Sequence, residues 1–189
     1  MIRMPLVLLL AALAAVPVLQ GCVPLVAAGA AGTALIATDR RTTGVYIEDE
    51  NIELKALGRL HEIPDAHVNA ASFNERVLLT GEVPDEATRK RVQEAIRTIP
   101  SVREVMDETQ IAGASSLTSR GNDTLITSNV KARMLNDPRF NATQVKVVTE
   151  AGVVYLMGLV THAEADAATE VARTTSGVSR VVTEFEYIS

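Results

Sequence analysis

Leu79-Thr80-Gly81-Glu82-Val83 is matched 77 positions later by Leu156-Met157-Gly158-Leu159-Val160, and this repeated stretch decides the fold. Each copy has an isolated glycine at the end of an expected strand, which backbone conformation explains better than phosphate binding does. Upstream, Val68 matches Val145 at the same offset. A period near 77 residues is too long for a solenoid repeat, so each copy is expected to form its own domain.

Around this stretch, each copy has the order helix, strand, strand, helix, strand. In the first copy these elements are expected at residues 51–60, 68–73, 77–79, 85–98 and 102–111. In the second they are expected at 125–135, 145–149, 153–157, 163–174 and 178–188. The two middle strands form a hairpin, and the last strand returns through a helical crossover, so it can pair in parallel. The sequence therefore predicts an α+β fold with two tandem αββαβ modules, each a three-stranded mixed sheet packed with two helices.

Helix caps are expected at three places. Asp85, after Pro84, precedes the second helix of the first copy, and Thr161 stands in the same place in the second copy. Both are residue types that accept a hydrogen bond from the first turn of a helix. Gly-Asn-Asp at 121–123 is expected to cap the first helix of the second copy.

The chain begins like an exported protein. One basic residue, Arg3, precedes an apolar run over residues 6–19, which is the layout of a secretory signal peptide and is too short to span a bilayer. The run ends in Leu-Gln-Gly-Cys at 19–22, which resembles the lipobox of bacterial lipoproteins. Residues 1–21 are thus predicted to be a lipoprotein signal peptide, with Cys22 as the lipidation site, carrying fatty acyl groups such as palmitate. The alternative is a free, reactive cysteine.

Residues 22–45 are predicted to be a lipidated tether. Residues 23–38 are small and apolar but too few to cross a membrane as a helix, so they lie near the membrane surface or form a flexible linker. Arg40 and Arg41 then either contact anionic headgroups or remain solvated. Val23 follows Cys22, whereas lipoproteins kept at the inner membrane tend to have Asp there, and this implies the outer membrane.

The repeated unit resembles the BON domain, a bacterial α/β module. The resemblance rests on Leu-x-Gly-x-Val, on the second helix, and on Gly-Val-x-x-Val at 177–181. The first copy departs from the pattern at Ser101, where glycine usually stands. The expected division is a BON domain at 46–112, a linker at 113–119 and a second BON domain at 120–189. With its lipobox, the whole chain resembles the outer-membrane lipoproteins that carry two BON domains.

No residue pattern indicates catalysis. His61, His67 and His162 lack metal-ligand spacing, and Ser115, Ser116 and Ser119 have no nucleophile motif around them. We therefore expect a protein that is not an enzyme and has no cofactor apart from the covalent lipid. A net charge of −5 also makes nucleic acid an unsuitable partner, because phosphate binding requires a basic surface.

The two copies differ in charge. Residues 42–112 hold eight basic and fourteen acidic residues, whereas residues 113–189 hold seven and eight. The second copy, at −1 against −6, is the better candidate to approach an anionic bilayer. On its first helix Ile126, Val130 and Met134 form one stripe, and Leu125 and Leu135 fall about 100° to either side at 100° per residue. These leucines either insert among headgroups or pack against the other module or the sheet edge.

The resemblance implies which alternative to expect. Dual-BON lipoproteins are understood to bind anionic phospholipids through this helix, and Leu125, Val130 and Leu135 match its apolar positions, with Lys131 beside them. Leu125 stands where the family can have Trp. The implied function is a periplasm-facing outer-membrane lipoprotein that supports envelope integrity at division sites. The competing expectation is an adaptor that binds envelope-assembly or cell-division proteins through the acidic first module. A periplasmic hydrolase is not expected, because the sequence has no hydrolase motif.

Overall fold

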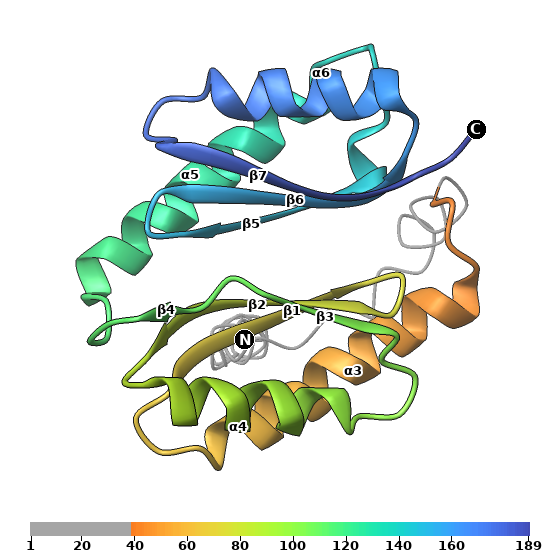
Figure 1. The fold of residues 1–189 in the computed structure, drawn as a ribbon. Coiled ribbons are helices and arrows are strands. Elements are labelled where there is room, and N and C mark those ends of the chain that lie inside the picture. The colour runs from red at the N-terminus through yellow and green to blue at the C-terminus, as the bar shows by residue number, and fades with distance from the viewer. Residues whose placement is uncertain (1–38) are drawn as a thin grey trace, which may run out of the picture. The chain divides into compact units, whose positions relative to one another are not determined.

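The structure is a computed structural model that describes residues 39–189, and in this part of the chain two sheets each carry two helices (Figure 1). The first module comprises α3 (Thr43–His61), β1 (His67–Phe73), β2 (Arg76–Val83), α4 (Glu86–Arg97), β3 (Glu104–Asp107) and β4 (Gln110–Ile111). The second comprises α5 (Leu117–Leu135), the short 3₁₀ helix η1 (Ala142–Gln144), β5 (Val145–Glu150), β6 (Val153–Val160), α6 (His162–Arg173) and β7 (Arg180–Tyr187). The predicted α+β class and αββαβ order are confirmed. The signal-like run, Cys22 and the tether up to residue 38 lie outside the described residues.

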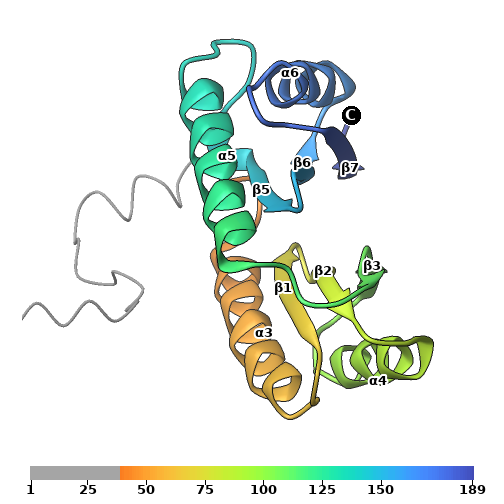
Figure 2. The same ribbon diagram turned by 90° about the vertical axis from the view of Figure 1, so that its left-hand side faces the viewer.

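In each module the central strand is the second strand of the hairpin. β2 pairs antiparallel with β1 and in parallel with β3, and β6 pairs antiparallel with β5 and in parallel with β7. Both helices of a module lie on the same face of its sheet (Figure 2). Side chains that alternate along β2, including Val77, Leu79 and Val83, pack there against α3 and α4. The mixed sheet with a helical crossover is thus as the sequence predicted.

The opposite face of each sheet is also buried. Leu78 of β2 joins Phe73 and Met106 in one apolar cluster with Tyr155 and Met157 of β6, so the two modules share a third core. A strand that is buried on both faces has a nearly continuous apolar sequence. This explains why Val-Leu-Leu at 77–79 and Val-Val-Tyr-Leu-Met at 153–157 do not alternate with polar residues.

The glycine of the repeated motif is required by close backbone approach. A Cβ added at Gly81 would lie 2.1 Å from the carbonyl oxygen of His67, and one at Gly158 would lie 2.6 Å from that of Gln144. Any larger residue would push the first strand away from the central strand. The leading glycine of the last motif has another cause. Gly177 has φ +88°, and Ser101, its counterpart in the first module, adopts φ +70°, a left-handed conformation that favours glycine.

The first helices begin earlier than predicted. α3 starts at Thr43 and α5 at Leu117, where Ser116 is the N-cap and accepts a hydrogen bond from the Ser119 amide. The expectation that residues 121–123 cap α5 is therefore wrong, and the end of the predicted linker lies inside this helix. Asp85 and Thr161 do cap α4 and α6 as predicted.

The inner faces of α3 and α5 are equivalent at an offset of 74 residues rather than 77. The segment from Leu135 to Val145 is three residues longer than the equivalent segment from His61 to Val68, so the helices and strands repeat with different offsets. The buried positions are Asp49, Ile52, Ala56 and Leu60 in α3 and Asp123, Ile126, Val130 and Met134 in α5. This correspondence allows any position on one helix to be compared with its counterpart on the other.

The last strand of the first module is interrupted, whereas one strand over 102–111 was predicted. The Asp107 carboxylate accepts hydrogen bonds from the amide of Thr109, at 2.9 Å, and from its hydroxyl, at 2.6 Å. This local turn separates β3 from β4, although both pair with β2. An aspartate that bonds to the backbone two residues on is a common way to break a strand.

Candidate functional site

The outward face of α5 exposes the two leucines that the sequence analysis singled out. Leu125 is 64% exposed and Leu135 is 72% exposed, so neither is covered by the other module or by the sheet edge. Lys131 is also exposed, one turn before Leu135. The assignment of Val130 to this surface is wrong, because Val130 is fully buried in the core between α5, β6 and α6. Helical geometry places it on the inner stripe with Ile126 and Met134.

The other cation in the second half of α5 holds the module together. Arg133 donates to the carbonyl oxygen of Val171 at 2.9 Å and to the Thr175 hydroxyl at 2.7 Å, which ties α5 to α6. Arg59, its counterpart in α3, makes the equivalent bonds to α4, including one of 2.6 Å to the Ala95 carbonyl oxygen. These arginines are engaged within their modules. Lys131 forms no ion pair within residues 39–189 and is available to a ligand.

Beside α5 lies an open hollow of about 440 Å³. The cations Arg120 and Lys131 line it, together with hydroxyl groups such as that of Ser128, but so do the acids Asp123 and Glu150. Burial raises the pKa of the Glu150 carboxyl. Because both signs of charge are present, the hollow is not an anion site by itself. Arg120 and Lys131 are the cations that an anion would meet in this hollow.

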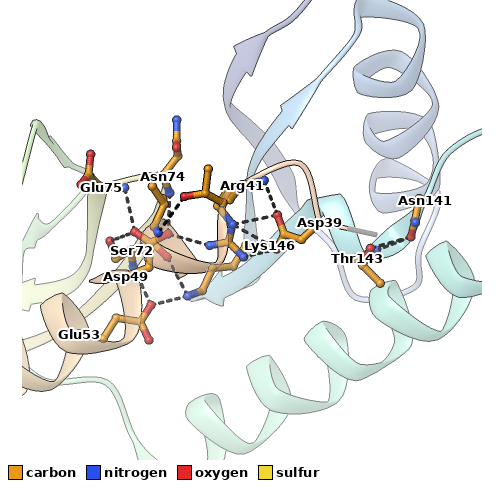
Figure 3. Close-up of polar contacts among 12 residues, drawn as sticks. Asp39, Arg41, Asp49, Glu53, Ser72, Asn74, Glu75, Asn141, Thr143 and Lys146 are labelled. Carbon is orange, nitrogen blue, oxygen red and sulfur yellow. Dashed lines mark hydrogen bonds and ion pairs between the residues drawn. The ribbon is translucent and has the colours of Figure 1, made fainter. Parts of the chain in front are cut away.

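The arginines of the tether end are held in ion pairs with the two modules. Arg40 donates to both oxygens of Glu164, at 2.7 and 2.8 Å, and to the carbonyl oxygen of Leu159, all in the second module. Arg41 lies in the first module, where it pairs with Asp39 and Asp49 (Figure 3). Its guanidinium also stacks over the ring of Phe73 at 4.0 Å. Both expectations for these residues, headgroup contact and free solvation, are therefore corrected. Residues 39–41 form a strap that is bound to both modules.

Asp49 is the centre of this polar cluster (Figure 3). Its carboxylate, 2% exposed, accepts hydrogen bonds from the Ser72 hydroxyl, from the amides of Asn74 and Glu75, and from Arg41. Asn74 and Glu75 form the hairpin turn between β1 and β2 and have positive φ. Asp123 binds the corresponding turn of the second module through the amides of Ala151 and Gly152. Neither turn-binding role was predicted from the sequence, in which Asp123 was expected only as part of a helix cap. Aligning the two helices at an offset of 74 pairs Asp49 with Asp123.

Polar contacts also join the modules around their shared core. Lys146 of β5 forms an ion pair with Glu53 of α3 and donates to the carbonyl oxygen of Ser72 at 2.9 Å. Arg76 donates to the carbonyl oxygen of Glu184 at 2.9 Å, and Arg103 pairs with Glu186 at 2.8 Å. These contacts link α3 and the first sheet to the strands at both sides of the second sheet.

The histidines and serines of interest are dispersed. His162 stacks on Tyr187 with ring centroids 4.1 Å apart, and Ser116 serves as a helix cap. No group of three His, Cys, Asp or Glu side chains within residues 39–189 is arranged to hold a metal ion. Over the same residues, no helix has both the length and the apolar character needed to cross a bilayer.

A second exposed apolar surface lies on α3. Ile47, Leu54 and Leu57 are each more than half exposed, and the sequence analysis did not single them out. They belong to the acidic first module, whereas the exposed leucines of α5 belong to the second. The structure therefore presents two apolar helix faces, one on each module.

Comparison with known proteins agrees with the repeat. The BON domain family model matches residues 48–113 and 122–189. The outer membrane lipoprotein DolP of Haemophilus influenzae is 38% identical over 174 residues, which cover 90% of each chain. The 21 kDa hemolysin of Actinobacillus pleuropneumoniae is 30% identical over 79% of each chain. The osmotically inducible protein Y of Escherichia coli is 29% identical over 73% of this chain and 72% of its own.

Proposed function

Because this chain belongs to the BON domain family and has two such domains, we propose that it is an outer-membrane lipoprotein that binds anionic phospholipids through α5 of its second module. Its similarity to the outer membrane lipoprotein DolP supports association with the outer membrane. Cys22 is the proposed site of lipidation, and the modules face the periplasm. In the cell this binding directs the protein to anionic lipid, at division sites, where it supports envelope integrity.

The observation that carries the lipid-binding proposal is the exposure of Leu125 and Leu135 on either side of the outward face of α5. Transfer of leucine side chains from water into the boundary between headgroups and acyl chains is favourable. Full burial of one leucine contributes roughly 1.5–3 kcal/mol. Lys131, between them along the helix, then keeps its ammonium group near lipid phosphate while its aliphatic part lies along the apolar surface.

Charge supports the choice of the second module. Residues 113–189 have a net charge of −1, whereas residues 42–112 have −6 and would be repelled by an anionic surface. Two shallow insertions and one lysine give weak binding in solution. A lipid anchor on Cys22 would confine the modules near the bilayer and raise their effective concentration there, so weak binding is sufficient.

The test is vesicle binding by the fragment 39–189, which retains the strap and both modules. We expect the fragment to sediment with vesicles that contain phosphatidylglycerol and to sediment much less with pure phosphatidylcholine vesicles. Leu125→Glu with Leu135→Glu is expected to abolish sedimentation with the anionic vesicles. The matched control, Leu54→Glu with Leu57→Glu on α3, adds the same charge to the first module and should still bind. Unaltered vesicle binding by a folded Leu125→Glu, Leu135→Glu protein would refute α5 as the membrane face.

A further inference from the structure

The exposed apolar residues of α3 follow a regular pattern. Ile47, Glu50, Leu54, Leu57 and His61 are all exposed and are spaced three, four, three and four residues apart. This is the a and d spacing of a heptad, which places the five side chains in one row along the outward face of the helix. Such a row is the seam along which one helix packs against another at a small crossing angle.

The second module shows that the fold does not require apolar residues there. At the offset of 74 that relates α3 to α5, Ile47, Leu54 and Leu57 correspond to Gly121, Ser128 and Lys131. Conversely, the exposed Leu125 and Leu135 correspond to Asn51 and His61. The inner faces of the two helices match while their exposed apolar positions do not coincide. The row on α3 is therefore a separate surface that the shared fold does not require.

Charge indicates the chemistry of the ligand. Glu50 lies in the middle of the row, is exposed, and has no ion pair within residues 39–189. A ligand that covers the row must supply a cation opposite Glu50, because a carboxylate buried without a partner is costly. An anionic bilayer lacks such a cation at a fixed place. Residues 23–38 of this chain are uncharged and would leave Glu50 unpaired.

We propose that the row formed by Ile47, Glu50, Leu54, Leu57 and His61 is a docking surface for an amphipathic helix of another protein, with Lys or Arg facing Glu50. This inference goes beyond lipid binding by α5 and does not depend on it. The partner helix packs its apolar stripe on Leu54 and Leu57, and its cation pairs with Glu50. The net charge of −6 on the first module attracts the same basic segment.

The first experiment is photo-crosslinking in cells with the full chain. A benzophenone amino acid replaces Leu54, or, as the matched control, Ser128 at the equivalent position of α5. We expect a protein adduct from position 54 and none of the same mass from position 128. Mass spectrometry should place the adduct in an amphipathic helical segment that carries Lys or Arg. An adduct to lipid or to a second copy of this chain, or no adduct, would overturn the proposal.

The second experiment measures the charge pairing. A synthetic peptide of the crosslinked segment is titrated against the fragment 39–189 and its variants. Glu50→Lys should weaken binding at least tenfold, and a peptide with its facing cation changed to Glu should restore it. Leu57→Lys, which installs the residue that the second module has, should also weaken peptide binding while vesicle binding through α5 is retained. Equal affinity for wild-type and Glu50→Lys proteins would overturn the proposal without touching the lipid-binding function.

Discussion

Arg40 and Glu164 form a two-point ion pair, with donor–acceptor distances of 2.7 and 2.8 Å, although 124 residues separate them in the chain. Glu164 also closes the capping box of α6 by accepting from the amide of Thr161 at 2.8 Å. One carboxylate therefore both caps the first turn of α6 in the second module and binds the strap that leads into the first module. The strap joins the modules at a point outside their shared apolar core.

The first prediction concerns acid stability. The hydrogen bond from Arg40, aided by Thr161, lowers the pKa of Glu164 from 4.5 to about 2. The stabilising contribution of Glu164 is therefore complete above pH 4.5 and is lost as the pH falls through 2. Arg40→Ala should raise the pKa of Glu164 and reduce the free energy of unfolding at pH 7 by about 1 kcal/mol, because the pair is partly solvated. Urea denaturation at pH 7 and pH 3 measures this, and a larger loss at pH 3 than at pH 7 would contradict it.

The second prediction compares the two turn-binding aspartates. Asp49→Ala should lower the free energy of unfolding by about 3–5 kcal/mol, because it leaves the buried Arg41 without this partner and frees the turn amides. Asp123→Ala removes two hydrogen bonds from backbone amides but leaves no buried cation. It should therefore lower the free energy of unfolding by about 1–3 kcal/mol. Thermal and urea denaturation of the fragment 39–189 provide the comparison. Equal losses in the two variants would show that Arg41 contributes little to the cluster.

The third prediction concerns the left-handed residue before each last strand. Ser101→Gly should stabilise the protein by about 0.5–1 kcal/mol, because relief of the left-handed strain exceeds the added entropy of the unfolded chain. Gly177→Ser should do the reverse, since a Cβ there would lie 3.0 Å from Cγ1 of Ile126. Differential scanning calorimetry of both variants tests the pair. A lower Tm for Ser101→Gly would contradict the assignment of strain to this site.

The fourth prediction addresses the independence of the modules. A fragment of residues 114–189 should unfold in one cooperative transition, because it retains its own core between α5, α6 and the sheet. Its Tm should be lower than that of the fragment 39–189, because Tyr155 and Met157 lose the cover of the first sheet. Calorimetry detects both effects. A fragment without a cooperative transition would show that the second module folds only together with the first.

The fifth prediction concerns anchoring. Cys22→Ser removes the proposed acceptor of the lipid and should release the full chain from the outer-membrane fraction. Cell fractionation followed by immunodetection measures the membrane-bound share. The matched control, Leu125→Glu with Leu135→Glu, keeps Cys22 and should remain in the membrane fraction. Undiminished recovery of Cys22→Ser in the outer-membrane fraction would refute lipidation at this residue.

Local patterns predicted most of the fold. The Leu-x-Gly-x-Val stretches lie in central strands, and Asp85 and Thr161 cap helices, because turn and cap chemistry depends on a few neighbouring residues. The starts of α3 and α5 were not predicted, since the buried aspartates in their second turns resemble loop residues. The position of Val130 followed from the helical period, whereas the resemblance assigned it to the surface; the structure agrees with the period.

The contacts of the strap could not be predicted. Arg40 finds its partner 124 residues away, and a charge pattern does not encode which distant carboxylate an arginine will meet. The shared core of the modules was also missed, although the unbroken apolar runs at 77–79 and 153–157 were a signal that both faces of each central strand are buried. The exposed row on α3 was also missed, because its apolar residues are recognised as a surface only from their exposure in the structure.

The strap also has a consequence for how the modules would be held if Cys22 carries the proposed lipid anchor. Because residues 39–41 are bound to both modules, an anchor at Cys22, the proposed lipidation site, is separated from the strap by seventeen residue steps. At about 3.5 Å per residue, these seventeen steps have a maximum reach of about 60 Å. Loss of the Arg40 and Arg41 contacts would lengthen the connection between Cys22 and the modules by only a few residues. It would, however, allow the two modules to rotate together about the point where the chain enters them. The strap therefore constrains their orientation at the bilayer more than their distance from it.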